Sequence, residues 1–146
     1  MSKIENWGPV AEIGCAIILR QPHILIAQRK PGDSLAGFWE FPGGKIEQGE
    51  TLAECLIREV FEELRVRVQP KIWLCEKMHH YPTKSIRLNF VICEWLQGEP
   101  VKYDCYDVRW VQVPELKSYR FLPADIDIIE KLQRKGNRLF SKDVRF

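Results

Sequence analysis

Three glutamates at helical spacing are the residues of this sequence best suited to chemistry. Glu59, Glu62 and Glu63 stand at positions i, i+3 and i+4, so on a helix their carboxylates project from one patch. Three like charges on one patch repel each other unless a cation neutralises them. Oxygen ligands without a nearby histidine or cysteine suit Mg²⁺ or Mn²⁺ better than zinc. The alternative interpretation is a solvated acidic helix face, which is common in proteins.

The segment in front of these glutamates favours phosphate chemistry. Gly43-Gly44-Lys45 allows the backbone to approach closely and offers a carbonyl oxygen as a further hard ligand. Mg²⁺ usually keeps several waters and takes its remaining ligands from substrate phosphates. The pattern therefore indicates a metal-assisted reaction on a phosphorylated compound.

A helix over residues 51–64 must present the glutamates. Thr51 followed by Glu54 forms a capping box, in which each side chain satisfies a free backbone N–H of the first turn. Apolar residues at helical period predict the buried face. They are Ala53, Leu56, Ile57, Val60 and Leu64.

Strand-like segments dominate the rest of the chain. Gln21-Pro22 predicts the turn of a hairpin between the first two strands. A closing helix is expected over residues 124–134, and the chain is therefore predicted to be a mixed α/β or α+β domain. The expected strands are 10–19, 23–28, 66–80, 85–96 and 108–113, with a short extended piece at 38–41.

Composition limits the other possibilities. The 146 residues fit one domain, residues 1–146, with a core of about 8–135 and a basic tail over 136–146. The 22 Lys and Arg against 20 Asp and Glu give a net charge of +2, which predicts neither a stable nucleic-acid partner nor a membrane partner. Five cysteines without C-x-x-C spacing are expected to be reduced, buried thiols. A polar start and no long apolar run lead us to expect a cytoplasmic protein without a membrane span.

The spacing around the predicted helix resembles the Nudix box. That pattern is Gly, five residues, Glu, seven residues, Arg-Glu, an apolar residue, any residue, Glu-Glu, any residue, Gly and an apolar residue. Arg65 stands where the family has glycine, so either Arg65 bears a modest backbone strain or the helix ends differently. The matching residues are Gly44, Glu50, Arg58, Glu59, Glu62 and Glu63.

Further segments are similar to the MutT-type branch of the Nudix family, among them Trp39 to Glu47, Gly98-Glu99-Pro100 and Leu122-Pro123-Ala124-Asp125. The resemblance implies a mixed β-sheet between helices, an α/β/α sandwich. It also implies hydrolysis that depends on Mg²⁺, with Mn²⁺ as a possible substitute. The expected substrates are nucleoside triphosphates, such as the oxidised purine nucleotide 8-oxo-dGTP, and the products are the monophosphate and pyrophosphate.

The resemblance also assigns roles at the metal end of the site. Glu59, Glu62 and Glu63 match the metal-binding glutamates, and the carbonyl of Gly43 matches a backbone ligand. Arg58 matches the residue that holds the glutamates in place, while Gly44 and Glu50 support the box. Asp104 aligns with an acid from a loop, although Asp107 is a rival. Glu59 is the preferred general base, with Glu62 or Asp104 as alternatives.

Recognition of the nucleotide is assigned to three residues. Arg29 aligns with an arginine near the phosphate, and Phe41 with an aromatic of the base pocket. Asp125 aligns with the residue that reads the base; as a carboxylate it would accept from N1–H and the exocyclic amine of guanine. The alternative for Asp125 is a cap for the helix that begins at Ile126.

Other functions share the same box. Pyrimidine nucleotides or the 5′ ends of RNA are alternative substrates, and a non-catalytic nucleotide-binding module is a third possibility. Such modules typically lose box glutamates, and this chain keeps them. The protein is expected to be a monomer or a homodimer.

Overall fold

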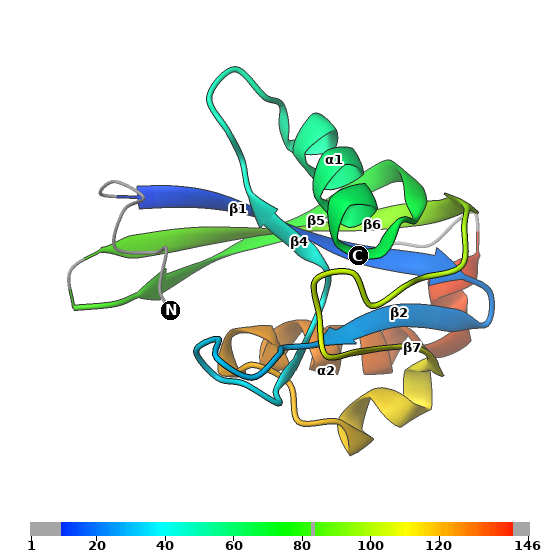
Figure 1. The fold of residues 1–146 in the computed structure, drawn as a ribbon. Coiled ribbons are helices and arrows are strands. Elements are labelled where there is room, and N and C mark those ends of the chain that lie inside the picture. Colours follow the sequence, from blue (N-terminus) through cyan, green and yellow to red (C-terminus); the bar gives the residue numbers. More distant parts are fainter. Residues whose placement is uncertain (1–9, 83, 142–146) are drawn as a thin grey trace.

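The computed structural model describes residues 10–82 and 84–141. One mixed sheet runs through the centre, with helices on both of its faces (Figure 1). This bears out the expected mixed architecture. The described residues form seven strands: β1 (Val10–Arg20), β2 (His23–Gln28), β3 (Trp39–Glu40), β4 (Gly43–Lys45), β5 (Arg67–His80), β6 (Ser85–Gln97) and β7 (Asp107–Gln112).

The main path of the sheet is β3-β2-β1-β6-β5, while β4 pairs with β1 and β7 pairs with β2. β1 and β6 are parallel, and the other pairs are antiparallel. The hairpin expected at Gln21-Pro22 is confirmed by the pairing of Arg20 with His23. The helices are α1 (Leu52–Leu64) and α2 (Ile126–Lys135), with shorter 3-10 turns at Val113–Ser118, Pro123–Asp125 and Gly136–Phe140.

Strand β1 is buried on both sides because the two helices cover opposite faces of the sheet. Its Ile18 belongs to the core beneath α1, together with Leu56 of the helix. Its Ile17 belongs to the core above α2, together with Leu132. Successive side chains of a strand point to opposite faces, so an unbroken apolar run is what a doubly covered strand requires.

Helix α1 begins as the sequence predicts. Thr51 is its N-cap, and the reciprocal hydrogen bonds between Thr51 and Glu54 are both present.

The buried face of α1 is rotated from the expected one. Leu56, Val60 and Leu64 are buried as expected, but Ala53 and Ile57 are exposed and Cys55 is buried in their place. The reason is β4, which packs against the flank that carries Cys55; the Cys55 Sγ lies 3.5 Å from the carbonyl oxygen of Gly44.

Strand β4 was not expected, because three residues with two glycines carry no periodic pattern. It pairs with β1 at Cys15–Gly43 and Gly14–Gly44. A Cβ atom on Gly43 would lie 1.9 Å from the carbonyl oxygen of Gly14, so only glycine permits this approach. The close contact brings the residues before α1 against the middle of the sheet.

The packed structure continues past the expected core boundary at residue 135. Gly136–Phe140 forms a 3-10 turn, and its Leu139 is buried in the core on the α2 side. The remainder of the expected basic tail, residues 142–146, lies outside the described residues.

The five cysteines are free thiols, as expected. Cys15, Cys55 and Cys93 are buried, whereas Cys75 and Cys105 are partly exposed. In the described part of the chain, no helix has the length and apolar character needed to cross a membrane.

Arg65 takes the left-handed conformation that the family's glycine would favour. Its φ is 60° and its ψ is 32°, and its backbone N–H donates to the carbonyl of Phe61 at the end of α1. Its guanidinium lies 3.9 Å from the ring centroid of Tyr103. The helix therefore ends in the ordinary way, and Arg65 bears the strain.

Two substitutions at this position isolate the backbone strain, because both remove the contact with Tyr103. We expect Arg65→Val to have a free energy of unfolding about 1–2 kcal/mol lower than Arg65→Gly, since a β-branched residue is strongly disfavoured at positive φ. Urea unfolding of the two variants measures the difference. Equal stabilities would contradict a left-handed residue 65.

Candidate active site

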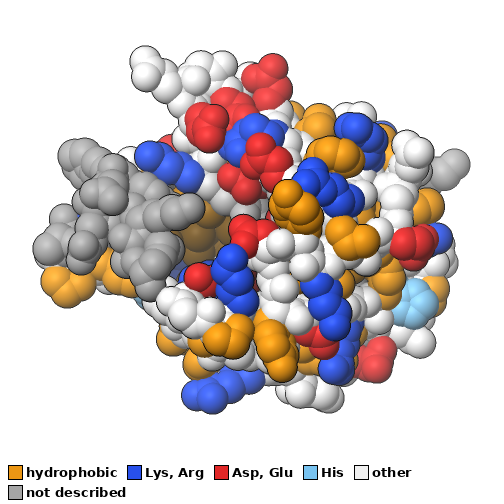
Figure 2. Space-filling view, in the orientation of Figure 1, with side chains coloured by type: hydrophobic (Ala, Val, Ile, Leu, Met, Phe, Trp, Pro, Cys, Tyr) orange, Lys and Arg blue, Asp and Glu red, His pale blue; other side chains and the backbone are white. Residues whose placement is uncertain are grey.

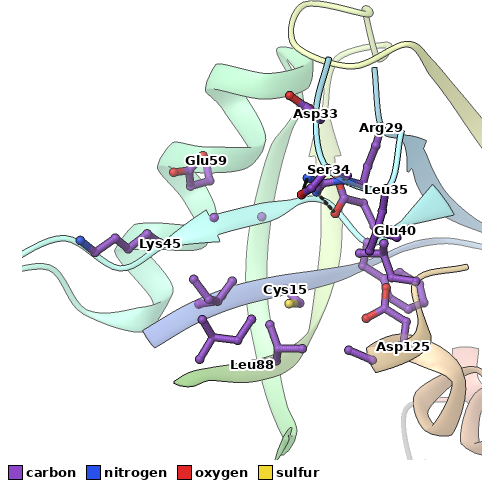
Figure 3. A pocket seen from close by; sticks show the side chains of 18 of the residues that line it. Cys15, Arg29, Asp33, Ser34, Leu35, Glu40, Lys45, Glu59, Leu88 and Asp125 are labelled. Atoms are coloured by element: carbon purple, nitrogen blue, oxygen red, sulfur yellow. Dashed lines mark hydrogen bonds and ion pairs between the residues drawn. The ribbon is translucent and has the colours of Figure 1, made fainter. Parts of the chain in front are cut away.

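A cavity of about 830 Å³ connects α1 with the start of α2. It runs from Glu59 and Glu63 of α1, past Gly14 and Cys15 of β1, to Asp125 (Figure 3). The structure thus brings together residues as distant in the sequence as Gly14 and Asp125. The predicted site residues that line it are Arg29, Phe41, Gly43, Gly44, Glu59, Glu63, Asp104 and Asp125.

Arg58 joins the other predicted residues into a cluster beside this cavity. Its Nε and one terminal nitrogen bind the two carboxylate oxygens of Glu50, at 2.6 and 2.9 Å. Its other terminal nitrogen lies 3.1 Å from a carboxylate oxygen of both Glu59 and Glu62. A further bond of 3.2 Å reaches the carbonyl of Lys45. Acidic side chains gather around a basic one over α1 in the surface view (Figure 2).

Glu50 is committed to this cluster. Both its oxygens contact Arg58, and one also accepts from the backbone N–H of Glu47 at 3.0 Å. The hydrogen bonds from Arg58 hold the pKa of Glu50 down at about 2. Glu50 therefore orders the loop before α1 and the guanidinium of Arg58.

Glu59 and Glu63 lie in a less polar setting. Burial raises the pKa of Glu59, although Arg58 opposes the shift, and burial raises the pKa of Glu63 well above its ordinary value. The Oε1 atom of Glu63 is buried and has no hydrogen-bond partner among the described residues. A Cβ on Gly44 would lie 2.3 Å from the carboxylate carbon of Glu59, so the missing side chain makes room for this group.

These observations fit a divalent cation. Glu63 offers an uncommitted buried oxygen, and all the donors are hard oxygen atoms. Within residues 10–82 and 84–141, however, no three acidic, histidine or cysteine side chains already converge as a metal cage. In this arrangement Arg58 holds Glu59 and Glu62 in ion pairs. A cation entering here has to compete with the guanidinium for both carboxylates.

The two candidate loop acids lie in different places. Asp104 lines the cavity, and its backbone N–H donates to the carbonyl of Glu63 at 3.2 Å. Asp107 belongs to β7, where its carboxylate accepts from the N–H of Val108 and pairs with Lys102 and Arg109. The geometry thus favours Asp104 as the acid next to the glutamates of α1.

Arg29 is held by a partner that the sequence did not single out. It donates to the carbonyl of Ser34 at 2.7 Å and to the carboxylate of Glu40 at 3.1 Å (Figure 3). Burial raises the pKa of Glu40, and Arg29 opposes the shift. The sequence feature that could have identified Glu40 is its position as an acidic residue between two aromatics, Trp39 and Phe41, both of which are buried.

Phe41 and Asp125 meet at the far end of the cavity. Phe41 is buried and packs against Phe121 with ring centroids 5.4 Å apart, so it serves both the core and the cavity wall. The backbone of Phe41 hydrogen-bonds the carboxyl group of Asp125, which is only 4% exposed.

Asp125 fits neither of its two expected roles, a carboxylate that reads the base or a cap for the helix that begins at Ile126. Within the described residues its side chain makes no capping hydrogen bond to α2, so the cap interpretation is wrong. Burial, followed by the charge of Glu40, raises its pKa to about 8. At neutral pH the free carboxyl is therefore mostly protonated, rather than the carboxylate assumed from the sequence.

The family model described as NUDIX domain matches residues 14–131. The chain belongs to the Nudix family. The 8-oxo-dGTP diphosphatase of Escherichia coli (strain K12) is 34% identical over 125 residues, covering 84% of this chain and 96% of the relative. The CTP pyrophosphohydrolase of the same organism is 31% identical over 119 residues, covering 82% of this chain and 88% of the relative.

A solved structure supports the same membership. The DNA mismatch repair protein MutT of methicillin-resistant Staphylococcus aureus 252 has a TM-score of 0.71 and 33% identity, over 87% of this chain and 98% of that one. The resemblance to the MutT-type branch is thus confirmed. As a Nudix hydrolase, the protein acts on phosphoric anhydrides and depends on a divalent metal.

The Arg58–Glu50 contact makes a stability prediction with a defined pH window. Because the pKa of Glu50 is about 2 in the folded protein, against an ordinary 4.5, its stabilisation is complete above pH 4.5 and is lost as the pH falls toward 2. We expect Glu50→Gln to lower the free energy of unfolding by about 1–3 kcal/mol at pH 7. Urea unfolding should show this deficit shrinking below about pH 4.5.

Glu130→Gln is the matched control, since Glu130 is exposed on α2. It should change the free energy of unfolding by no more than about 0.5 kcal/mol, both at pH 7 and below about pH 4.5. A deficit in Glu50→Gln that stays constant down to pH 3 would refute the ion pair.

Proposed function

We propose that this Nudix hydrolase is a Mg²⁺-dependent pyrophosphohydrolase of purine nucleoside triphosphates, with oxidised guanine nucleotides such as 8-oxo-dGTP as preferred substrates. The products are the nucleoside monophosphate and pyrophosphate. The observation that carries this proposal is the cavity that joins Glu59 and Glu63 of α1 to the buried carboxyl of Asp125. The glutamates suit a metal ion and phosphates, and the carboxyl of Asp125 suits a nucleotide base. Similarity to an 8-oxo-dGTP diphosphatase over most of the chain also supports it.

At the phosphate end, Glu59, Glu62, Glu63 and the carbonyl of Gly43 would hold Mg²⁺. The ion would neutralise the charge of the phosphates and make a water more acidic. Glu59 would accept the proton of the attacking water, because it lines the cavity and a hydrogen bond from Arg58 orients its carboxylate.

Arg29 lines the same cavity, on the side of Glu40 and Asp125 (Figure 3). Its ion pair with Glu40 keeps the guanidinium at the cavity wall, within reach of a phosphate.

At the base end, the neutral carboxyl of Asp125 offers one donor and one acceptor. The oxidised base 8-oxoguanine presents O6 as an acceptor and N7–H as a donor, which is the complementary pair. Unoxidised guanine presents acceptors at both O6 and N7. Facing the O6 and N7 edge, a protonated Asp125 favours the oxidised base; facing the N1–H and O6 edge, which both bases share, it favours neither.

A second candidate is a pyrimidine triphosphate. Cytosine presents an acceptor at N3 beside its amino donor, and a neutral Asp125 complements this pair as well. Similarity to a CTP pyrophosphohydrolase over 82% of the chain also favours it. The products of a panel of triphosphates, assayed with Mg²⁺, separate the two candidates.

The metal assignment is tested by removing one charge at a time. We expect Glu62→Gln and Glu63→Gln each to lower kcat by at least about 100-fold, because each removes a negative charge that the cation needs. Removal of divalent ions with EDTA should abolish turnover, and added Mg²⁺ should restore it. Glu130→Gln, the exposed control, should keep the wild-type rate. Two folded variants with near wild-type rates would refute the assignment.

The role of Asp125 is tested through its pH dependence. Its pKa of about 8 predicts that kcat/KM for 8-oxo-dGTP is highest below pH 8 and falls above it, as the donor is lost. Asp125→Asn keeps a donor and an acceptor, so its profile should lack this fall. Asp125→Ala should raise KM by a factor equivalent to about 1–3 kcal/mol.

Two outcomes would contradict the proposal that Asp125 recognises an oxidised base. Wild-type and Asp125→Asn proteins with the same fall above pH 8 would show that another group titrates. A strong preference of the wild-type protein for CTP over 8-oxo-dGTP would favour the second candidate.

A further inference from the structure

An ion pair joins two loops that line the cavity. Lys30 lies in the loop from β2 to β3, and Asp104 lies in the loop from β6 to β7. The Lys30 Nζ is 2.5 Å from a carboxylate oxygen of Asp104, and both residues line the cavity. Asp104 also raises the pKa of Lys30, so the ammonium stays charged. The pair therefore places the ammonium group of Lys30 beside the space proposed for the phosphates.

The backbone of Asp104 is fixed next to the glutamates of α1. Its N–H donates to the carbonyl of Glu63, and the N–H of Val101 donates to the carbonyl of Leu64 at 3.0 Å. The charge of Asp104 is one of the causes that raise the pKa of Glu63, which reflects their proximity. The loop backbone is thus held next to Glu63, while the side chain of Asp104 pairs with Lys30.

The ion pair itself is suited to exchange. The side chain of Lys30 is 46% exposed and that of Asp104 is 60% exposed, and exposed pairs are weakly held. Lys30 has a flexible stem and a point charge that phosphate oxygens attract strongly. Its backbone is anchored, since its carbonyl accepts from the N–H of Asp33 at 3.2 Å. An arriving triphosphate can therefore draw the ammonium away while the loop stays in place.

We propose that Lys30 is a positioning residue that controls when Asp104 joins the metal site. Without substrate, Lys30 holds the Asp104 carboxylate in an ion pair at the cavity wall. When the phosphates of the substrate bind Lys30, Asp104 is released toward the cation at Glu59 and Glu63. Substrate binding then strengthens metal binding. This inference rests on the proposed function, because it requires a cation at the glutamates and an anionic substrate.

The experiment measures Mn²⁺ binding to the whole, substrate-free protein by isothermal titration calorimetry. We expect Lys30→Met to bind Mn²⁺ about 3- to 10-fold more tightly than wild type, because Asp104 is free to act as a ligand. In an Asp104→Asn background, the same Lys30→Met substitution should leave the affinity unchanged. Lys30→Arg, which keeps the charge and the ion pair, should bind like wild type.

Arg20→Met is the matched control. It also removes one positive charge and one ion pair, the 2.8 Å contact of Arg20 with Glu99, near the start of the loop that carries Asp104. It should leave the Mn²⁺ affinity unchanged.

Three results would overturn the proposal. One is an unchanged affinity in Lys30→Met. A second is a tightening that persists in the Asp104→Asn background, which would reflect the lost charge alone. A third is the same tightening in Arg20→Met. Failure of the wild-type protein to bind Mn²⁺ at all would instead refute the proposed metal site, and this inference with it.

Discussion

The guanidinium of Arg58 makes the acidic end of this protein possible. It lies within hydrogen-bond distance of Glu50, Glu59 and Glu62, and it ties them to the backbone at Lys45. Without it, the carboxylates of α1 and the loop before it would repel each other before any cation arrived. A planar group with five fixed donors can serve three acids at once, which a lysine could not do. In the folded protein, Arg58 therefore neutralises part of the charge of these carboxylates before a metal ion binds.

The second requirement is close contact between the helix and the sheet. Gly43 admits β4 against β1, and Gly44 leaves room for the carboxylate of Glu59. This contact rotates α1 so that Cys55 turns inward and Ile57 turns outward. The same short strand places the backbone of Gly43 against Glu63. The position of the glutamates is thus set by the absence of two side chains as much as by the helix itself.

Much of this arrangement could be predicted because its signals are local. The capping box of Thr51, the spacing of the glutamates and the long apolar strands all depend on neighbours in the sequence, and these elements were found within a few residues of their observed bounds. Strand β4 and the true face of α1 were not found, since they depend on a contact with a distant strand. Glu40, Lys30 and the protonation of Asp125 were missed for the same reason. Each is determined by burial or by a partner from another part of the chain.

The buried oxygen of Glu63 has a consequence for how the site takes up a cation. An acid whose pKa is raised by burial binds protons more tightly, so a metal and protons compete for the same atoms. Any proton that Glu63 carries is given up to the medium when the metal binds. The apparent affinity for the metal should increase as the pH of the solution rises. The heat of metal binding should also depend on the buffer that receives those protons.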